Sequence, residues 1–375
     1  MTGQRPLQGM RIGLLTASAS RAGAGVFEAV LQQAAMIRAL GGEALIFALH
    51  DAYSDTDAVR FVPSTVATFP VSGPRQFGYA PGLVKALIDA ELDLLHLHGI
   101  WMYPSRAATQ WRRATKRPYL ISAHGMLDPT TVNRRPWKKA IGRIGYEQAS
   151  WRAADAFHAL TKQEAANIRG QVGKARVIVI PNAAPMPNAD NLRDMPAPKY
   201  LFLGRIHAQK NLRALMSAWR IGAMDRNGGL LIAGWGDPAE EARVRADADY
   251  PGSAVRLLGP VHGAEKQALL ASARFMVLPS LGEAMPMSIL EGWAAGLPAI
   301  ISTQSNLPEG IAAGAALACE TDPASIAAAL RQAAAMNDDE WQAMSRAGVA
   351  LVEGPFSAQT VAAQWARAYR GESLE

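Results

Sequence analysis

The sequence contains a single cysteine, Cys319, in 375 residues. This excludes an internal disulfide framework and a zinc site built from cysteines, and it is typical of a reducing compartment. We expect Cys319 to be a small buried apolar residue. No apolar run reaches the roughly 18 residues that a membrane-crossing helix needs, and the alanine-rich run Ile311–Cys319 falls far short. The polar start, Met1–Met10, lacks the apolar region of a secretory signal. We therefore expect a cytoplasmic protein, free or bound at the inner face of the cell membrane.

Charge is distributed unevenly along the chain. Residues 1–190 carry a net charge of +9 and residues 191–375 a net charge of −3, within a total of +6. The stretch Arg106–Arg152 alone contains eleven basic and two acidic residues. This excess predicts that the first half meets an anionic surface or substrate.

Short apolar runs alternate with helical patterns throughout, which is typical of α/β units with parallel sheets. The chain is long enough for two such units, each with its own core. In the first half we expect strands at Met10–Leu15, Ala44–Leu49, Leu94–Leu97, Tyr119–Ser122, Ala156–Ala159 and Val177–Ile180. In the second half we expect strands at Tyr200–Leu203, Leu230–Ala233, Val255–Leu258, Phe275–Leu278 and Pro298–Ile301.

A proline-rich segment separates the two predicted units. Pro181–Pro198 contains five prolines and almost no periodic apolar pattern, so it is predicted to be an inter-domain linker with the hinge. We place an N-terminal domain at residues 1–185 and a C-terminal domain at residues 186–355. Residues 356–375 are expected to form an amphipathic helix that packs back towards the N-terminal domain.

Two cations follow the first strand of the second unit. Gly204, Arg205 and Lys210 come after Tyr200–Leu203, at the carboxyl end of a strand, where open α/β sheets bind ligands. The planar fork of arginine, the point charge of lysine and the start of the next helix suit a diphosphate. The alternative is a solvated basic loop.

Two glutamates eight residues apart follow the strand Phe275–Leu278. Glu291 has apolar neighbours in a predicted helix, so its carboxylate is better placed to accept hydrogen bonds from ligand hydroxyls than to provide solubility. Glu283, in the loop before that helix, can reach the other end of the same ligand. The spacing alone is a weak signal, because helices are rich in glutamate.

With the Gly204-Arg205 and Lys210 motif, this glutamate pair makes the chain resemble the retaining glycosyltransferases of family 4. Four further segments resemble the branch that builds bacterial exopolysaccharide and capsule: Leu97–Pro104, Ser122–Pro129, Ile180–Asn182 and Asn306–Glu309. The similarity covers nearly the whole chain. It implies the GT-B fold, in which two Rossmann-like doubly wound α/β domains face a central cleft, the first binding the acceptor and the second the nucleotide sugar.

The resemblance also implies roles for individual residues. Arg205 and Lys210 would hold the donor diphosphate, Glu291 the ribose hydroxyls and Glu283 the sugar hydroxyls. His124, directly after the strand Tyr119–Ser122, would contact the donor sugar, and the alternative is a capped structural histidine. The remaining implied donor-site residues are Gly23, Gly25, Gly204, Val261, His262 and Met285.

Two of the implied loops have alternative interpretations. Val261 and His262 would present backbone groups to the base, or they form a plain turn between a strand and a helix. The loop Gly23–Gly25 would face the diphosphate, or it opens a dinucleotide site supported by Asp51. We disfavour a nicotinamide cofactor, because the third position of that fingerprint is the bulky acid Glu28.

No metal and no cofactor are expected apart from the donor substrate, a UDP-sugar or GDP-sugar. The acid pairs Asp55/Asp57 and Asp247/Asp249 follow no predicted strand, and we interpret them as solvated acids. The charge of the diphosphate would instead be balanced by cationic side chains and helix ends. Among the histidines, His96 is expected to face the core and His98 to line the acceptor side.

The basic stretch interleaves Trp137, Ile141 and Ile144 with cations. We expect residues 106–152 to make peripheral contact with an anionic membrane, where a lipid-diphosphate acceptor would arrive. The alternative is a basic face whose apolar residues lie in the core. No nucleic-acid-binding module accompanies the charge, so nucleic acid is not an expected partner.

The resemblance thus implies transfer of a hexose, with mannose as the first choice, to a saccharide or a polyprenyl-diphosphate-linked saccharide in polysaccharide biosynthesis, and we expect this transfer to need no metal. Retention would follow if the leaving phosphate oxygen helps to deprotonate the acceptor on the same face. Two alternatives stay open. One is a sugar-nucleotide epimerase or hydrolase of the same fold, and the other is a non-catalytic sugar-nucleotide-binding partner in a polysaccharide assembly complex.

Overall fold

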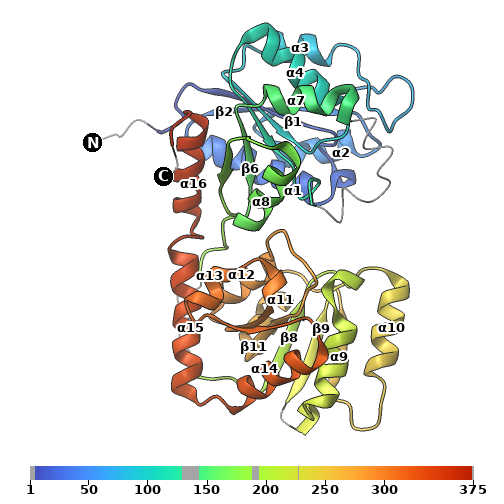
Figure 1. Ribbon diagram of the computed structural model, residues 1–375, viewed down its shortest axis with the longest axis vertical. Helices are drawn as coiled ribbons and strands as arrows, with labels where there is room; N and C mark the ends of the chain where they lie inside the picture. Colours follow the sequence, from blue (N-terminus) through green and yellow to red (C-terminus); the bar gives the residue numbers. More distant parts are fainter. Residues whose placement is uncertain (1–4, 129–142, 188–193, 227, 374–375) are drawn as a thin grey trace. The chain divides into compact units, whose positions relative to one another are not determined.

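The computed structural model describes residues 5–128, 143–187, 194–226 and 228–373. The chain forms two compact α/β units, one of Met1–Ile180 with Ala362–Glu375 and one of Pro181–Val361 (Figure 1). The predicted boundary at residues 185 and 186 therefore lies within the second unit, and so does residue 356, where the final segment was expected to begin. The described part of the proline-rich segment forms neither helix nor strand.

The first unit contains a seven-stranded sheet in the order β3-β2-β1-β4-β5-β6-β7. Every strand pair in it is parallel. Because the strand order reverses between β1 and β4, the loops after these strands diverge and leave room for a ligand at the carboxyl edge. The strands are β1 (Arg11–Thr16), β2 (Glu43–Leu49), β3 (Thr65–Phe69), β4 (Leu94–His98), β5 (Tyr119–Ser122), β6 (Ala156–Ala159) and β7 (Val177–Val179).

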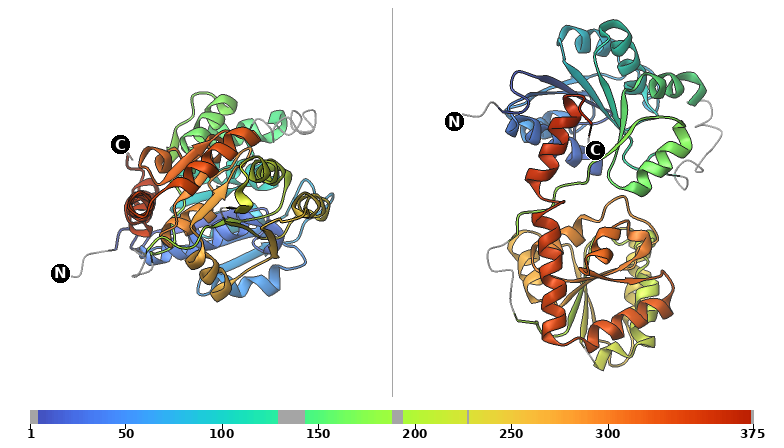
Figure 2. Two further views of the ribbon diagram at one scale, coloured as in Figure 1. Left: turned by 90° about the horizontal axis from the view of Figure 1, so that it is seen from below. Right: turned by 60° about the vertical axis from the view of Figure 1, so that its left-hand side comes forward.

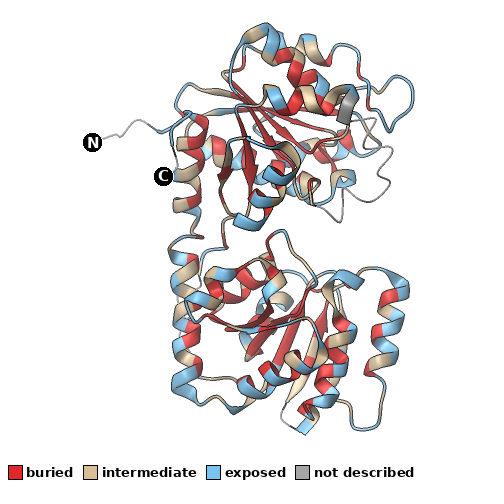
Figure 3. Cartoon of the chain, viewed as in Figure 1, coloured by how far each residue is buried: buried red, intermediate tan, exposed pale blue. Residues whose placement is uncertain are grey.

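Helices flank this sheet (Figure 2). Figure 3 shows that the inner strands are buried, whereas the helices turn exposed residues outwards. The helices are α1 (Gly25–Ala39), α2 (Ser54–Asp57), α3 (Leu83–Asp89), α4 (Tyr103–Thr115), α7 (Gln148–Ala153) and α8 (Lys162–Val172).

The second unit repeats the plan with a six-stranded sheet in the order β10-β9-β8-β11-β12-β13, which reverses between β8 and β11. Its strands are β8 (Lys199–Leu203), β9 (Gly229–Ala233), β10 (Val255–Gly259), β11 (Phe275–Leu278), β12 (Ala299–Ser302) and β13 (Ala316–Cys319). Its helices are α9 (Leu212–Ile221), α10 (Pro238–Ala248), α11 (Gly263–Ser272), α12 (Met287–Ala294), α13 (Pro308–Ala312), α14 (Pro323–Ala335) and α15 (Asp338–Glu353).

Two strands lie outside the predicted set, and both end the order of their sheet. β3 is only half-buried, so its sequence lacks the continuous apolar run of a central strand. β13 has the sequence Ala-Leu-Ala-Cys, and alanine has a low preference for strands. Cys319 itself is buried, as predicted, and burial raises the pKa of its thiol to about 12.

The last helix, α16 (Ala358–Tyr369), ends in the first unit. Its Trp365 ring lies 5.3 Å from the ring of His96, centroid to centroid, and the Tyr369 hydroxyl lies 2.9 Å from Nδ1 of the same histidine. Nε2 of His96 is 2.8 Å from the Ser122 hydroxyl on β5. His96 therefore faces the core, as expected, and joins two strands to the C-terminal helix.

Candidate functional site

An ion pair joins the loops that follow β8 and β11, the two strands between which the order of the second sheet reverses. Nζ of Lys210 lies 2.5 Å from Oε1 of Glu283. The Ser280 hydroxyl donates to the same oxygen at 2.5 Å, and the Glu283 backbone N–H donates to the Gln304 carbonyl at 3.2 Å. Glu283 is thus fixed by side-chain and main-chain contacts at the edge where α/β sheets bind ligands.

Arg205 lies beside this pair in sequence, yet its side chain is exposed and forms no ion pair with the described residues. The backbone of the next residue, Ile206, forms two hydrogen bonds with the loop after β9. The Ile206 N–H donates to the Trp235 carbonyl at 2.9 Å, and the Asp237 N–H donates to the Ile206 carbonyl at 3.0 Å. A Cβ added to Gly236 would lie 1.8 Å from the Ile206 oxygen, so only glycine allows the two loops to approach this closely. The loop thus presents an exposed guanidinium on a fixed backbone.

Glu291 lies on α12 and forms a second ion pair, which the sequence did not predict. Its Oε1 is 3.0 Å from Nζ of Lys266, on α11, and both side chains are half-buried. Lys266 lies in the first turns of the helix that follows the Val261 and His262 loop. This position is the sequence feature from which the ion pair could have been predicted. Val261 is buried, whereas His262 is exposed and occupies the N-cap position of α11 without a side-chain capping bond.

Met285 is buried, and its sulfur accepts a hydrogen bond from the Asn182 backbone N–H at 3.2 Å. This contact connects the site loop after β11 to the start of the second unit. The helix α12 begins at Met287, and Pro286 is its N-cap.

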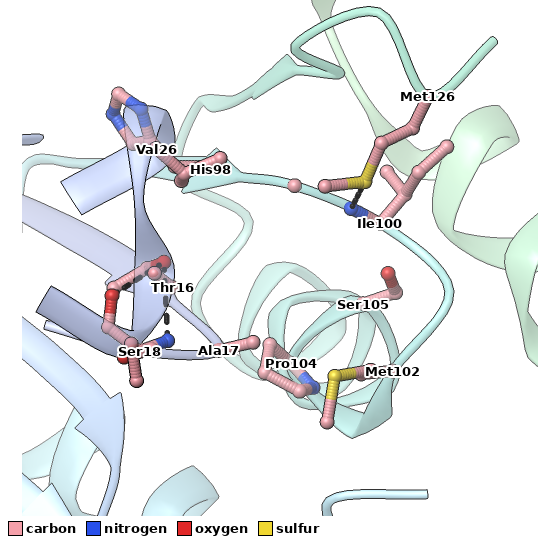
Figure 4. A pocket seen from close by; sticks show the side chains of 13 residues that line it. Thr16, Ala17, Ser18, Val26, His98, Ile100, Met102, Pro104, Ser105 and Met126 are labelled. Atoms are coloured by element: carbon pink, nitrogen blue, oxygen red, sulfur yellow. Dashed lines mark hydrogen bonds between the residues drawn. The ribbon is translucent and has the colours of Figure 1, made fainter. Parts of the chain in front are cut away.

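The first unit has a cavity of about 280 Å³ at the carboxyl ends of β1 and β4. Figure 4 shows Ile100, Met102 and Met126 across the cavity from Thr16 and Ser18. The lining residues are Thr16, Ala17, Ser18, Ala22, Gly23, Val26, His98, Gly99, Ile100, Met102, Pro104, Ser105 and Met126. Gly23 and His98 are therefore among them, while Gly25 is the first residue of α1 and lies outside this set.

Asp51 does not support a dinucleotide site, because its carboxylate is hydrogen-bonded to the loop before α1. It accepts hydrogen bonds from the Ser18 hydroxyl at 2.7 Å and the Ser20 hydroxyl at 2.8 Å. Gly23 fits closely in this loop, since an added Cβ would lie 3.0 Å from the Ser18 carbonyl oxygen. The aspartate thus shapes the wall of the cavity.

His124 follows β5 in a left-handed backbone conformation, with φ of +51°. Its Nε2 lies 3.0 Å from Nδ1 of His98, and the two rings are stacked with centroids 5.2 Å apart. Burial lowers the pKa of His124 to about 3, so the imidazole is neutral near pH 7. In that state the ring can form hydrogen bonds but carries no charge.

One member of the acid pair Asp55/Asp57 was interpreted wrongly, while Asp55 is exposed as expected. Asp57 is not solvated but buried on α2, where it accepts hydrogen bonds from the Arg21 backbone N–H at 2.8 Å and from the Arg21 guanidinium at 2.5 Å. These bonds lower the pKa of Asp57 to about 2. Asp247 pairs with Arg213 at 2.9 Å. Among the residues that the structure describes, no group of three His, Cys, Asp or Glu side chains is placed to hold a metal ion.

Much of the predicted membrane-contacting stretch lies outside the described residues, including Trp137 and Ile141. Tyr146 turns inwards, and its hydroxyl donates to the Trp101 carbonyl at 2.8 Å. On α4, Arg106 and Arg113 are exposed beside a second cavity of about 220 Å³. No helix in the described ranges is long and apolar enough to cross a membrane.

Comparison with known proteins matches both units. Residues 24–183 match the family described as glycosyl transferase 4-like domain, and residues 197–336 match the family described as glycosyl transferases group 1. The chain is 28% identical over 324 residues to the phosphatidyl-myo-inositol mannosyltransferase of Mycobacterium leprae, covering 78% of each protein.

Two solved structures show the same fold. Sucrose-phosphate synthase from Thermosynechococcus elongatus has a TM-score of 0.74 at 22% identity, covering 96% of this chain and 98% of that protein. HepE from Anabaena in complex with UDP has a TM-score of 0.76 at 16% identity, covering 96% of this chain and 100% of that protein. The chain therefore belongs to the group 1 glycosyltransferases of family 4 and has the GT-B fold.

Proposed function

We propose that this glycosyltransferase moves a hexose, with mannose as the first choice, from a nucleotide diphosphate to a saccharide or lipid-linked saccharide in polysaccharide biosynthesis. The observation that carries the proposal is the exposed guanidinium of Arg205, which forms no ion pair with the described residues, five residues before Lys210 of the 2.5 Å pair with Glu283. The mannosyltransferase from M. leprae supports mannose as the sugar, and the HepE complex with UDP supports a nucleoside diphosphate as the carrier class.

In this proposal the cationic and the acidic side chains bind different parts of the donor. A diphosphate would attract both Arg205 and Lys210, because each is a cation at the edge where the sheet order reverses. When Lys210 turns to the phosphates, the carboxylate of Glu283 becomes free to accept hydrogen bonds from sugar hydroxyls. Glu291 would accept those of the ribose, and His124 is assigned to the donor sugar on the resemblance stated above.

Transfer with retention would use the leaving phosphate oxygen itself. As the bond between the sugar and this oxygen breaks, the oxygen gains negative charge and accepts the proton of the acceptor hydroxyl on the same face. Arg205 and Lys210 would stabilise that charge, so we propose that no metal ion is required. No side chain then needs to form a covalent intermediate.

The cavity in the first unit is the proposed acceptor site. Two polar side chains that line this cavity already form hydrogen bonds within the protein. The Thr16 hydroxyl lies 3.3 Å from the Ser18 carbonyl, and the Ser18 hydroxyl donates to Asp51. The exposed Arg106 and Arg113 would favour approach to an anionic membrane surface that carries a lipid-linked acceptor.

A transfer assay tests the proposal. The enzyme is incubated with UDP-linked and GDP-linked mannose and glucose, a panel of free and lipid-linked saccharides, and EDTA, and the anomeric configuration of the product is read by NMR. We expect a retained linkage with EDTA present, and a loss of at least about 100-fold in turnover for Glu283→Gln. Glu265→Gln, an exposed glutamate of the same unit, is the control. Donor consumption without an acceptor product would favour a hydrolase or epimerase, and binding without turnover would favour a non-catalytic partner.

A further inference from the structure

The turn that carries His124 has an uncommon backbone. His124 has φ of +51° and Gly125 has φ of +73°, so two successive residues are left-handed. This backbone conformation costs free energy for a residue other than glycine. It persists only where the surrounding structure holds it. Within the turn, the Met126 N–H donates to the Ala123 carbonyl and the Asp128 N–H to the Gly125 carbonyl, each at 3.1 Å.

The fixing group is the carboxylate of Glu164, at the start of α8. Oε1 of Glu164 accepts a hydrogen bond from the Gly125 N–H at 2.9 Å, and Oε2 accepts one from the Leu160 N–H at 2.8 Å. The side chain is 8% exposed, and both of its oxygens are therefore used inside the protein. Burial raises the pKa of Glu164, while these two N–H bonds act in the opposite direction.

The same helix makes a second contact with the turn. Nδ2 of Asn167, one helical turn after Glu164, donates to Oδ2 of Asp128 at 3.1 Å. Helix α8 thus contacts the turn at Gly125 and again at Asp128. The imidazole of His124 is fixed separately by the stacked ring of His98.

We propose that Glu164 is a positioning residue for sugar transfer, which fixes the left-handed turn so that the His124 imidazole is held ready for the donor sugar. The proposal rests on the function proposed above for His124. The sequence shows Thr161-x-x-Glu164, the pattern of a helix cap, and Thr161 does cap α8 by accepting from the Glu164 N–H at 3.1 Å. The contact with Gly125 joins this local cap to a residue 39 positions earlier in the chain.

Hydrogen exchange tests the bracing without any substrate. In Glu164→Gln one oxygen is replaced by an amide donor, so one of the two N–H groups loses its acceptor while the side-chain volume is kept. We expect amide exchange in residues 123–128 to become at least about tenfold faster, because exchange follows local opening. Faster exchange confined to α8 itself would show a helix cap only and would overturn the proposal.

Kinetics test the role in catalysis. We expect Glu164→Gln to lower kcat about 10- to 100-fold, since a small displacement of a contact group has effects of this size. The affinity for the nucleoside diphosphate should stay within about twofold, because Arg205, Lys210 and Glu291, the charged residues proposed to bind it, lie in the other unit. In a His124→Ala background the same change should lower kcat by less than about twofold, since coupled residues are non-additive.

The matched control is Glu340→Gln. Glu340 is also the third residue of a capped helix, and its Oε2 accepts from the Asn337 N–H at 3.0 Å, but it contacts no turn that bears a site residue. This variant should keep wild-type kcat. An equal loss for Glu164→Gln with and without His124 would contradict the proposal. If the wild type transfers no sugar to any acceptor, the proposed function fails, and the exchange experiment still decides whether Glu164 holds the turn.

Discussion

Nζ of Lys266 lies 3.0 Å from Oε1 of Glu291, so the carboxylate assigned to the ribose hydroxyls is held by a cation from the neighbouring helix. The two side chains come from α11 and α12 and are half-buried. A cationic partner on one oxygen holds the carboxylate in one orientation, and its other oxygen can then accept hydrogen bonds from hydroxyls.

We predict that Lys266→Met weakens nucleoside diphosphate binding by about tenfold, because the loss of one hydrogen bond to a charged group costs about 1.5 kcal/mol or more. The loss should be smaller for the 2′,3′-dideoxynucleotide, which has no ribose hydroxyls for Glu291. Isothermal titration measures both. Lys199→Met, an exposed lysine at the start of β8, is the control. Equal weakening of both nucleotides would show that Lys266 does not act through Glu291.

The buried Glu147 predicts a pH dependence of stability. Its Oε1 accepts from the Trp101 N–H at 2.6 Å, and burial raises its pKa to about 7, from an ordinary value of 4.5. The folded chain favours the protonated form of Glu147. The stabilisation of the folded state by this protonation is therefore fully present below pH 4.5 and is lost as the pH rises through 7.

Between pH 5 and pH 9 we expect the free energy of unfolding of the wild type to fall by roughly 3 kcal/mol more than that of Glu147→Gln, which cannot ionise. Urea denaturation at the two pH values gives this difference. Glu91→Gln, an exposed glutamate of the same unit, should leave the wild-type dependence unchanged. A parallel response of wild type and Glu147→Gln would show that the buried carboxyl does not titrate in this range.

The Tyr369 hydroxyl connects the C-terminal helix to the core of the first unit. It lies 2.9 Å from Nδ1 of His96, and the Gln33 amide donates to it from α1. Burial holds the pKa of His96 well below its usual range, so the ring is neutral and its Nδ1 can accept from the hydroxyl. All three groups are buried.

We predict that Tyr369→Phe destabilises the chain by about 1–3 kcal/mol, because it leaves two buried polar groups without a partner. Gln33→Leu should lower the free energy of unfolding less in the Tyr369→Phe background than in the wild type, since both residues belong to one hydrogen-bond network. Thermal unfolding measures these differences. Tyr53→Phe, on an exposed tyrosine of the same unit, is the control. Additive losses would contradict a shared network.

The fold and the principal loops of the site could be predicted from sequence because both depend on local patterns. Continuous apolar runs identified the central strands, and the position of Arg205 and Lys210 after a strand placed them at the ligand-binding edge. The strands at the sheet ends, β3 and β13, were missed because they are half-buried or rich in alanine, so they lack that signal.

Contacts between distant segments could not be predicted in the same way. Asp57 was interpreted as solvated because its sequence neighbours are polar, yet Arg21 on another loop encloses it. The contact of Glu164 with Gly125 likewise depends on how α8 lies against the turn after β5, and only its local cap is visible in the sequence.

Nucleotide binding tests the central claim most directly. UDP and GDP are titrated into the wild type, Arg205→Ala and Arg331→Ala, an exposed arginine of α14 that serves as the control. The account predicts that one nucleotide binds the wild type and Arg331→Ala equally, and binds Arg205→Ala at least about tenfold more weakly, because the free guanidinium is lost. If neither nucleotide binds the wild type, or if Arg205→Ala binds as tightly as the wild type, the donor site is not where this account places it.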